Sequence, residues 1–277
     1  MAEQFHDCFT HQDVVDSYAK VRPNYPPSLF ERFASLTKQH ERAWDVGCGS
    51  GQATISIAEH YKTVVATDVS EPQLSHAIQR PNITYTKMSA TPETAEELER
   101  IVGPEGSVDL VTVATALHWF DLDKFYAIVK HVLCKPGGLF AAWTYSSTSV
   151  SVSPEFDKEI DRWNEKVKVY KTERSKYTAN QYRNLPFPFE HVPGVEAGKG
   201  VEGNPDEVKM EKLMSFDDFM LLWQSAPYLL QAKEEGVDLL NEEAIETLSK
   251  VWGPERVRTV SFSLFLLLGT VSAPSSK

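Results

Sequence analysis

The chain lacks the features that mark nucleic-acid-binding and disulfide-rich proteins. It has 277 residues and a net charge of −11, and its sequence contains no run of lysine and arginine residues. An acidic surface repels phosphate backbones, so we expect no nucleic-acid partner. The three cysteines, Cys8, Cys48 and Cys134, are odd in number and far apart. This spacing predicts neither a disulfide framework nor a zinc site.

Long hydrophobic runs are also missing. The stretch from 264 to 268 is apolar, but it is far too short to cross a bilayer and is typical of a buried strand. Residues 1–10 are polar and acidic and do not resemble a signal peptide. We therefore expect a cytoplasmic protein without a membrane partner. Hydrophobic content of 42% and charged content of 24% are those of an ordinary globular protein.

Several common catalytic motifs are absent as well. The eight histidines do not have the spacing of a zinc-binding helix, and the sequence contains no G-x-S-x-G elbow and no P-loop. We therefore predict no metal site, and neither the nucleophilic serine of the α/β-hydrolases nor the phosphate-binding loop of the P-loop nucleotidases.

What is present is an alternation of apolar strands and amphipathic helices. Five segments are typical of buried strands: 43–46, 63–67, 83–87, 108–114 and 139–143. Helices are expected between them, which predicts a doubly wound α/β fold with ligands at the carboxyl ends of the strands. Beyond Thr144 the pattern changes to long helices, over 154–182 and 215–229, and a last strand.

A glycine turn follows the first of these strands. Gly47, Gly49 and Gly51 stand directly after Asp45, and Asp68 closes the second strand. The dinucleotide fingerprint requires Gly or Ala at the next position, but Gln52 stands there. This difference favours a ligand without phosphates, to which the backbone must approach closely. A carboxylate at Asp68 suits a ribose diol, because it can accept two hydroxyl hydrogen bonds.

The segment 45–51, taken with Asp68, resembles the first motif of class I S-adenosylmethionine-dependent methyltransferases. The resemblance implies a Rossmann-like sheet of seven mostly parallel strands with a helical substrate cap, and S-adenosylmethionine as cofactor. A glycine turn of an unrelated α/β protein is the alternative. The cofactor contacts that the resemblance implies are Tyr18, Arg22, Asp45, Gly47, Gly49, Gly51, Asp68, Val69, Ser89, Ala90, Ala114 and Trp119.

One domain is expected over 1–277. Its parts are lid helices (1–40), a cofactor-binding core (41–144), cap insertions with the sixth strand (145–259) and a last strand (260–269). Ser89 and Ala90 would border the adenine ring, although a helix N-cap explains Ser89 nearly as well. The string from Tyr18 to Tyr25 resembles a lid that crosses the cofactor. There Arg22 could bind the methionine carboxylate, although a surface loop shaped by its prolines is the alternative.

The segment 115–121, Thr-Ala-Leu-His-Trp-Phe-Asp, resembles the trans-aconitate methyltransferase-like branch of this family. His118 is the one catalytic candidate, because an imidazole with a pKa near neutrality can act as a general base. The alternative is that His118 packs and hydrogen-bonds to the backbone, which would hold the loop. Segments 182–189 and 214–225 resemble, more loosely, the substrate-facing part of the same branch.

The resemblance implies methyl transfer to a small molecule, most directly O-methylation of a small carboxylic acid. Hydrogen-bond donors in the second half could bind such an acid: Trp143, Tyr145, Tyr177, Arg183 and Trp223, with Arg174 as a further candidate. An N- or C-methyltransferase for a small amine or prenylated ring is the alternative within the family. A non-catalytic protein that binds S-adenosylmethionine is the alternative outside it. The sequence leaves the oligomeric state open.

Overall fold

The structure is a computed structural model, and it describes residues 24–92, 94–145, 150–170, 174–224, 229, 232–233 and 235–272. The chain divides into two compact units. The sheet unit comprises residues 25–144, 180–208 and 265–277, and the helical unit comprises residues 1–24, 145–179 and 209–264. The boundary at Tyr145 coincides with the expected start of the cap, whereas residues 180–208, which we expected in the cap, belong to the sheet unit.

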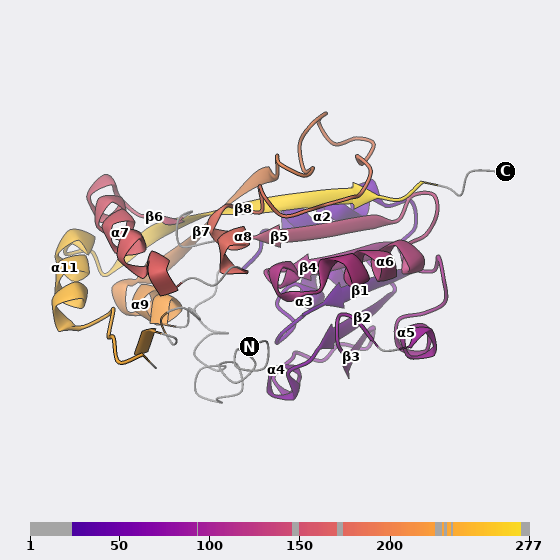
Figure 1. Cartoon of the computed structure of the whole chain (residues 1–277), viewed down its shortest axis with the longest axis horizontal. Coiled ribbons are helices and arrows are strands. Elements are labelled where there is room, and N and C mark those ends of the chain that lie inside the picture. Colours follow the sequence, from indigo (N-terminus) through magenta and orange to yellow (C-terminus); the bar gives the residue numbers. More distant parts are fainter. Residues whose placement is uncertain are drawn as a thin grey trace. The chain divides into compact units, whose positions relative to one another are not determined.

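Short, buried strands form the centre of the sheet unit (Figure 1). They are β1 (Arg42–Val46), β2 (Thr63–Asp68), β3 (Ile83–Lys87), β4 (Leu110–Ala114), β5 (Leu139–Thr144) and the last residues of β8 (Val257–Thr270). Their order is β3-β2-β1-β4-β5-β8, parallel up to β5 and antiparallel at β8. The predicted doubly wound, mostly parallel sheet is confirmed. Its order reverses between β1 and β4, where such sheets bind ligands.

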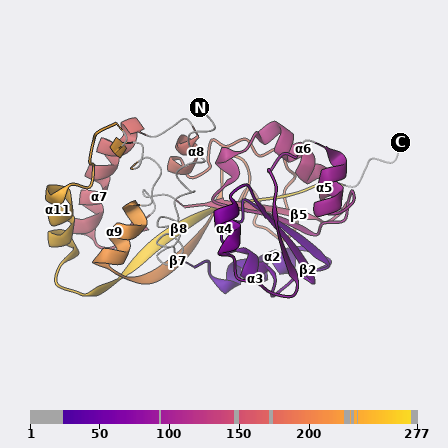
Figure 2. The same ribbon diagram turned by 90° about the horizontal axis from the view of Figure 1, so that it is seen from below.

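Helices cover both faces of this sheet. Figure 2 shows α6 (Leu122–Val132) on one face and α2 (Pro27–Leu36) with α3 (Thr54–Ile57) on the other. The unit also contains α4 (Glu71–Ser75), α5 (Ala95–Ile101) and the short 3-10 helix η2 (Leu117–Trp119). Ser70 caps the α4 helix, because its side chain accepts the backbone amide of Gln73. Residues 50–53 remain in the turn, so the α3 helix has only four residues.

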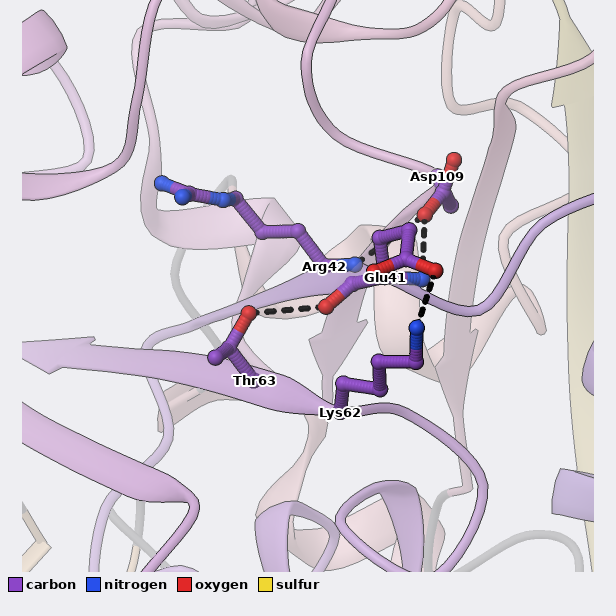
Figure 3. Close-up of polar contacts among 5 residues, drawn as sticks. All are labelled: Glu41, Arg42, Lys62, Thr63 and Asp109. Carbon is purple, nitrogen blue, oxygen red and sulfur yellow. Dashed lines mark hydrogen bonds and ion pairs between the residues drawn. The ribbon is translucent and has the colours of Figure 1, made fainter.

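A network of polar contacts fixes the edge of the sheet where β1 and β2 begin (Figure 3). One carboxylate oxygen of Asp109 accepts the backbone amides of Glu41 and Arg42, at 2.8 and 3.0 Å. The Thr63 hydroxyl donates to the carbonyl of Glu41, at 2.7 Å. These bonds satisfy backbone groups at the amino ends of the strands, opposite the edge that carries the glycine turn.

The helical unit has an aromatic core. Its helices are α7 (Pro154–Val167), η4 (Lys168–Tyr170), α8 (Ser175–Ala179), α9 (Phe216–Gln224) and α11 (Glu242–Trp252). Figure 1 shows α7, α9 and α11 gathered together. The rings that pack between them belong to Phe156, Trp163, Phe219, Trp223 and Trp252.

Strands in this unit are β6 (Val150–Ser151), most of β7 (Asp206–Ser215) and the first part of β8. The two-residue β6 pairs with β8 and was not expected from its polar sequence. With it and β7, the whole sheet has eight strands. The expected helix over 154–182 is divided into α7, η4 and α8, and α11 was not expected at all.

Candidate functional site

The glycine turn connects β1 to α3, and two of its glycines are required by close neighbours. All three adopt positive φ angles, +66° at Gly47, +56° at Gly49 and +83° at Gly51. A Cβ at Gly47 would lie 2.7 Å from the Cβ of Ala116, and one at Gly51 would collide with the phenol of Tyr85. At Gly49 the nearest side-chain atom, from Gln73, is 3.7 Å away. A Cβ at Gly49 would thus make an ordinary contact without a collision, and its positive φ is what favours glycine there.

Asp45 lies beneath the turn and is fully buried. Its two carboxylate oxygens accept hydrogen bonds from the hydroxyl groups of Thr54, at 2.6 Å, and Thr112, at 2.7 Å. Burial raises the pKa of Asp45 to about 6, although both hydroxyl groups favour the ionised form. Asp45 therefore joins β1, α3 and β4 below the turn, and its predicted role as a cofactor contact stays a prediction.

Asp68 stands at the end of β2 and holds the turn through the backbone. One carboxylate oxygen accepts the amide of Gly49 and the other accepts the amide of Ser70, both at 2.8 Å. These two bonds tie the end of β2 to the turn on one side and to the start of α4 on the other. The next residue, Val69, is 40% exposed. A carboxylate next to an exposed apolar side chain fits a ribose with an attached flat base.

The remaining cofactor candidates of the sheet unit lie at the same ends of β3 and β4. Ser89 is exposed and accepts the amide of Thr91, so the alternative of a local turn also has an observed basis. Ala90, Ala114 and Trp119 are partly exposed. Tyr18 and Arg22 lie outside the described residues.

The segment after β4, which carries His118, lies against the turn through two other residues. Ala116 is the residue that a Cβ at Gly47 would meet, and the ring of Phe120 would lie 3.3 Å from that Cβ. His118 is only 7% exposed, and its Nδ1 lies 3.0 Å from the hydroxyl of Tyr182. Its ring lies 4.9 Å from that of Trp119. The sequence did not single out Tyr182, because its 64-residue separation from His118 gives no local signal.

Two indoles among the substrate candidates lie in cores. Trp143 is fully buried in the sheet unit, where its ring contacts those of Tyr25, Phe30 and Phe33. Trp223 is 4% exposed in the helical unit, with its ring 4.4 Å from that of Trp163. Large aromatic rings gain most by such packing. The structure accounts for both residues as packing groups, and a contact with substrate stays a prediction.

The other substrate candidates are more accessible. Arg183 is exposed in the sheet unit, and its Nε donates to the side chain of Gln181. Tyr145 and Tyr177 are partly exposed in the helical unit, and Arg174 there is exposed. Within the described residues no group of three metal-ligating side chains comes together, and no helix has the length and apolarity needed to cross a bilayer.

Comparisons with known proteins agree with this geometry. Residues 44–142 match a family model described as a methyltransferase domain, which covers β1 to β5 and the glycine turn. A Dictyostelium discoideum protein that is provisionally named a methyltransferase is 29% identical over 263 residues, which are 92% of each chain. A Saccharomyces cerevisiae protein provisionally named an S-adenosylmethionine-dependent methyltransferase is 34% identical over 50% of this chain and 46% of its own.

A solved structure extends the similarity to nearly the whole chain. It is a protein of Anaeromyxobacter dehalogenans that is provisionally described as a type II methyltransferase. The two chains are 32% identical with a TM-score of 0.74, and the match covers 91% of this chain and 99% of the other. The glycine turn, the acid at the end of β2 and these similarities show that the chain belongs to the class I S-adenosylmethionine-dependent methyltransferases.

Proposed function

We propose that this S-adenosylmethionine-dependent methyltransferase methylates an oxygen of a small carboxylic acid. The observation that carries the proposal is the position of segment 115–121, whose sequence resembles the trans-aconitate methyltransferase-like branch. Ala116 and Phe120 of this segment lie against Gly47 of the cofactor turn. His118 and Trp119, between them, are thus held next to the turn, where an acceptor must approach the methyl group.

A carboxylate is an acceptor that suits this site chemically. Bound S-adenosylmethionine supplies a methyl group on a sulfonium that is already a good leaving group. Transfer forms a bond between carbon and the carboxylate oxygen and breaks the bond between carbon and sulfur. The carboxylate is ionised at neutral pH, so no proton has to be removed first. The protein then has to align the reactants and exclude water, and alignment can supply roughly 7–11 kcal/mol.

The accessible donors are candidates for binding the acid. Arg183, Arg174, Tyr145 and Tyr177 carry groups that donate to carboxylates. A residue that only binds the acid should raise KM for the acid when its donor is removed and should leave kcat unchanged. Arg183→Lys and Tyr177→Phe test this, with affinity for S-adenosylmethionine as the control.

Three alternatives remain as proposals. An amine acceptor would have to lose a proton, and His118 would be the candidate base. A C-methyltransferase for a prenylated ring would need an apolar acceptor pocket. A protein that binds S-adenosylmethionine without turnover would have the same glycine turn, and only an activity measurement separates it from an enzyme.

The test has two stages. Titration calorimetry with S-adenosylmethionine and S-adenosylhomocysteine measures cofactor binding first, with Asp68→Ala as the matched weak-binding variant. A methyl-transfer screen with labelled cofactor then covers small carboxylic acids, amines and phenols, and mass spectrometry identifies products. Methyl esters that alkali hydrolyses would support the proposal. Products methylated only on nitrogen or carbon would contradict it, and binding without turnover on any class would favour the non-catalytic alternative.

A further inference from the structure

The side chain of Gln73 points from α4 toward the glycine turn, although it is only 7% exposed. Its Oε1 and Cδ atoms lie 3.7 and 4.0 Å from the position that a Cβ would take at Gly49. Gly49 is also the residue whose amide Asp68 accepts, at 2.8 Å. The amide group of Gln73 and the carboxylate of Asp68 therefore both lie beside Gly49, where the ribose of the cofactor is predicted to bind.

The start of α4 has the sequence of a capping box, Ser-x-x-Gln. In such a box the serine side chain accepts the amide of the glutamine, and the glutamine side chain reaches back to the amide of the serine. The first half is formed, because the Ser70 hydroxyl accepts the amide of Gln73 at 3.4 Å. In place of the second half, Asp68 accepts the amide of Ser70 at 2.8 Å. Asp68 thus takes the partner that the Gln73 side chain has in a complete box.

The amide group of Gln73 forms no hydrogen bond within the residues that the structure describes. The bonds of Gln73 there belong to its backbone, whose N–H donates to Ser70 and whose carbonyl accepts the amide of His76. Most buried polar side chains have a hydrogen-bond partner, so a buried amide without one calls for an explanation. A ligand bound at the turn would lie next to this amide and could supply the partner.

We propose that Gln73 is a cofactor-binding residue whose amide group forms a hydrogen bond with a ribose hydroxyl of S-adenosylmethionine. An ionised carboxylate such as that of Asp68 can only accept, whereas each ribose hydroxyl has one proton and two lone pairs. A carboxamide supplies two N–H donors and an acceptor oxygen, so it can satisfy the hydroxyl groups that a carboxylate alone leaves incomplete. The proposal rests on the predicted binding of the ribose at Asp68 and not on the nature of the methyl acceptor.

Ligands that lack one hydroxyl test this contact directly. S-adenosylhomocysteine and its 2′-deoxy and 3′-deoxy forms are titrated by calorimetry into the full-length wild-type protein and into Gln73→Met. Methionine has a similar length and shape but no amide. We expect Gln73→Met to weaken binding of S-adenosylhomocysteine about 2- to 10-fold, as expected for one neutral hydrogen bond. One of the two deoxy forms should bind both proteins with similar affinity, because the hydroxyl that Gln73 contacts is already missing.

The comparison separates a bond to the ribose from a packing role. If Gln73 only packed beside Gly49, Gln73→Met would weaken the binding of all three ligands by the same factor, and this result would overturn the proposal. Unchanged affinity for S-adenosylhomocysteine in folded Gln73→Met would overturn it too. Gln73→Ala, which shortens the side chain, gives the same comparison if Gln73→Met does not fold.

Gln79→Met is the matched control. The Gln79 amide donates to the carbonyl of Ala77, at 3.1 Å, so its loss should leave the affinity for all three ligands unchanged. The experiment needs no methyl acceptor, and its result therefore stands whether or not the screen finds a methyl ester. If both deoxy forms bind the wild-type protein as tightly as S-adenosylhomocysteine does, the proposal fails together with the ribose assignment of Asp68.

Discussion

The sheet unit and the helical unit both contain packed aromatic rings, but the sheet unit also holds buried and partly buried acids near the ends of its strands. In the sheet unit, buried or partly buried acids have specific partners: Asp45 binds two threonine hydroxyls, and Asp68 and Asp109 each bind two backbone amides. In the helical unit, aromatic rings from α7, α9 and α11 pack edge to face or tilted. Directional bonds fix atoms to fractions of an ångström, whereas ring packing mainly fills volume.

Ring packing is thus common to both units, and the hydrogen-bonded acids are what the unit that must place reacting atoms has in addition. The three acids of the sheet unit lie at the ends of strands, where the backbone has unpaired groups. The rings of the helical unit come from helices far apart in sequence, from Phe156 to Trp252. Variants of the two kinds should therefore change different measured quantities.

The largest effect is expected in the aromatic core. Trp252 is 2% exposed and its ring contacts those of Phe156, Phe216 and Phe219. Trp252→Ala should lower the free energy of unfolding by about 3–5 kcal/mol, because it leaves a cavity. Urea denaturation measures this change. Val169→Ala, in the same unit but 80% exposed, is the control and should have almost no effect.

The next largest effect that we expect is a change of stability with pH, which comes from Asp45, the fully buried acid of the sheet unit. Because the folded pKa of Asp45 is about 6 against an ordinary 3.8, folding favours the protonated form. Its contribution to stability is fully present below pH 3.8 and is lost as the pH rises through about 6. The loss is on the order of 3 kcal/mol.

Urea denaturation from pH 4 to 7 tests this contribution. In Asp45→Asn the decrease between pH 4 and 6 should be smaller than in wild type. Thr112→Val removes a donor that favours the ionised form, so it should move the decrease to higher pH. Parallel curves for wild type and Asp45→Asn would contradict the prediction.

A third comparison separates backbone strain from steric collision. Gly47→Ala and Gly198→Ala both place a Cβ at positive φ, +66° and +80°. Gly198 has no neighbour within 4 Å, whereas Gly47 faces Ala116. We expect Gly47→Ala to cost about 1–3 kcal/mol more in unfolding free energy, because collisions in a packed region cost that amount. It should also weaken S-adenosylmethionine binding, which calorimetry measures. Equal costs would mean that the loop with Ala116 adjusts freely.

The smallest effect on stability that we predict is that of Asp109. We compare it with Asp68, which lies at the opposite edge of the sheet. Asp68→Ala should weaken S-adenosylmethionine binding by about 1–3 kcal/mol while the protein stays folded. Asp109→Ala removes two similar bonds to backbone amides at the edge shown in Figure 3. It should lower the free energy of unfolding by about 1–3 kcal/mol and leave cofactor affinity unchanged. Unchanged affinity in Asp68→Ala would refute the ribose assignment.

Much of the sheet unit could be predicted because its signals are local. Buried parallel strands are short apolar runs, and the caps at Ser70 and Asp121 precede their helices directly. The helical unit was predicted less well. The α11 helix was missed although its sequence indicates it: Ile245, Leu248 and Trp252 recur at intervals of three and four residues, and Asn241 caps its first turn.

The candidate site likewise has one part that the sequence predicted and one part that it did not. The glycine turn and Asp68 follow from spacing alone, because strand, turn and acid are adjacent in the chain. The partners that hold them do not: Tyr85 over Gly51, Ala116 against Gly47 and Tyr182 on His118 come from distant segments. A pair of residues with no fixed sequence separation leaves no pattern in a single sequence.

The sequence by itself determined the fold class, the position of the cofactor turn and the family, because these depend on the order of strands, glycines and acids along the chain. Only the tertiary structure decided which side chain lies beside the His118 ring, because hydrogen bonds depend on which donors and acceptors come within about 3 Å. In this protein the hydroxyl of Tyr182, 64 residues away along the chain, lies 3.0 Å from Nδ1 of His118.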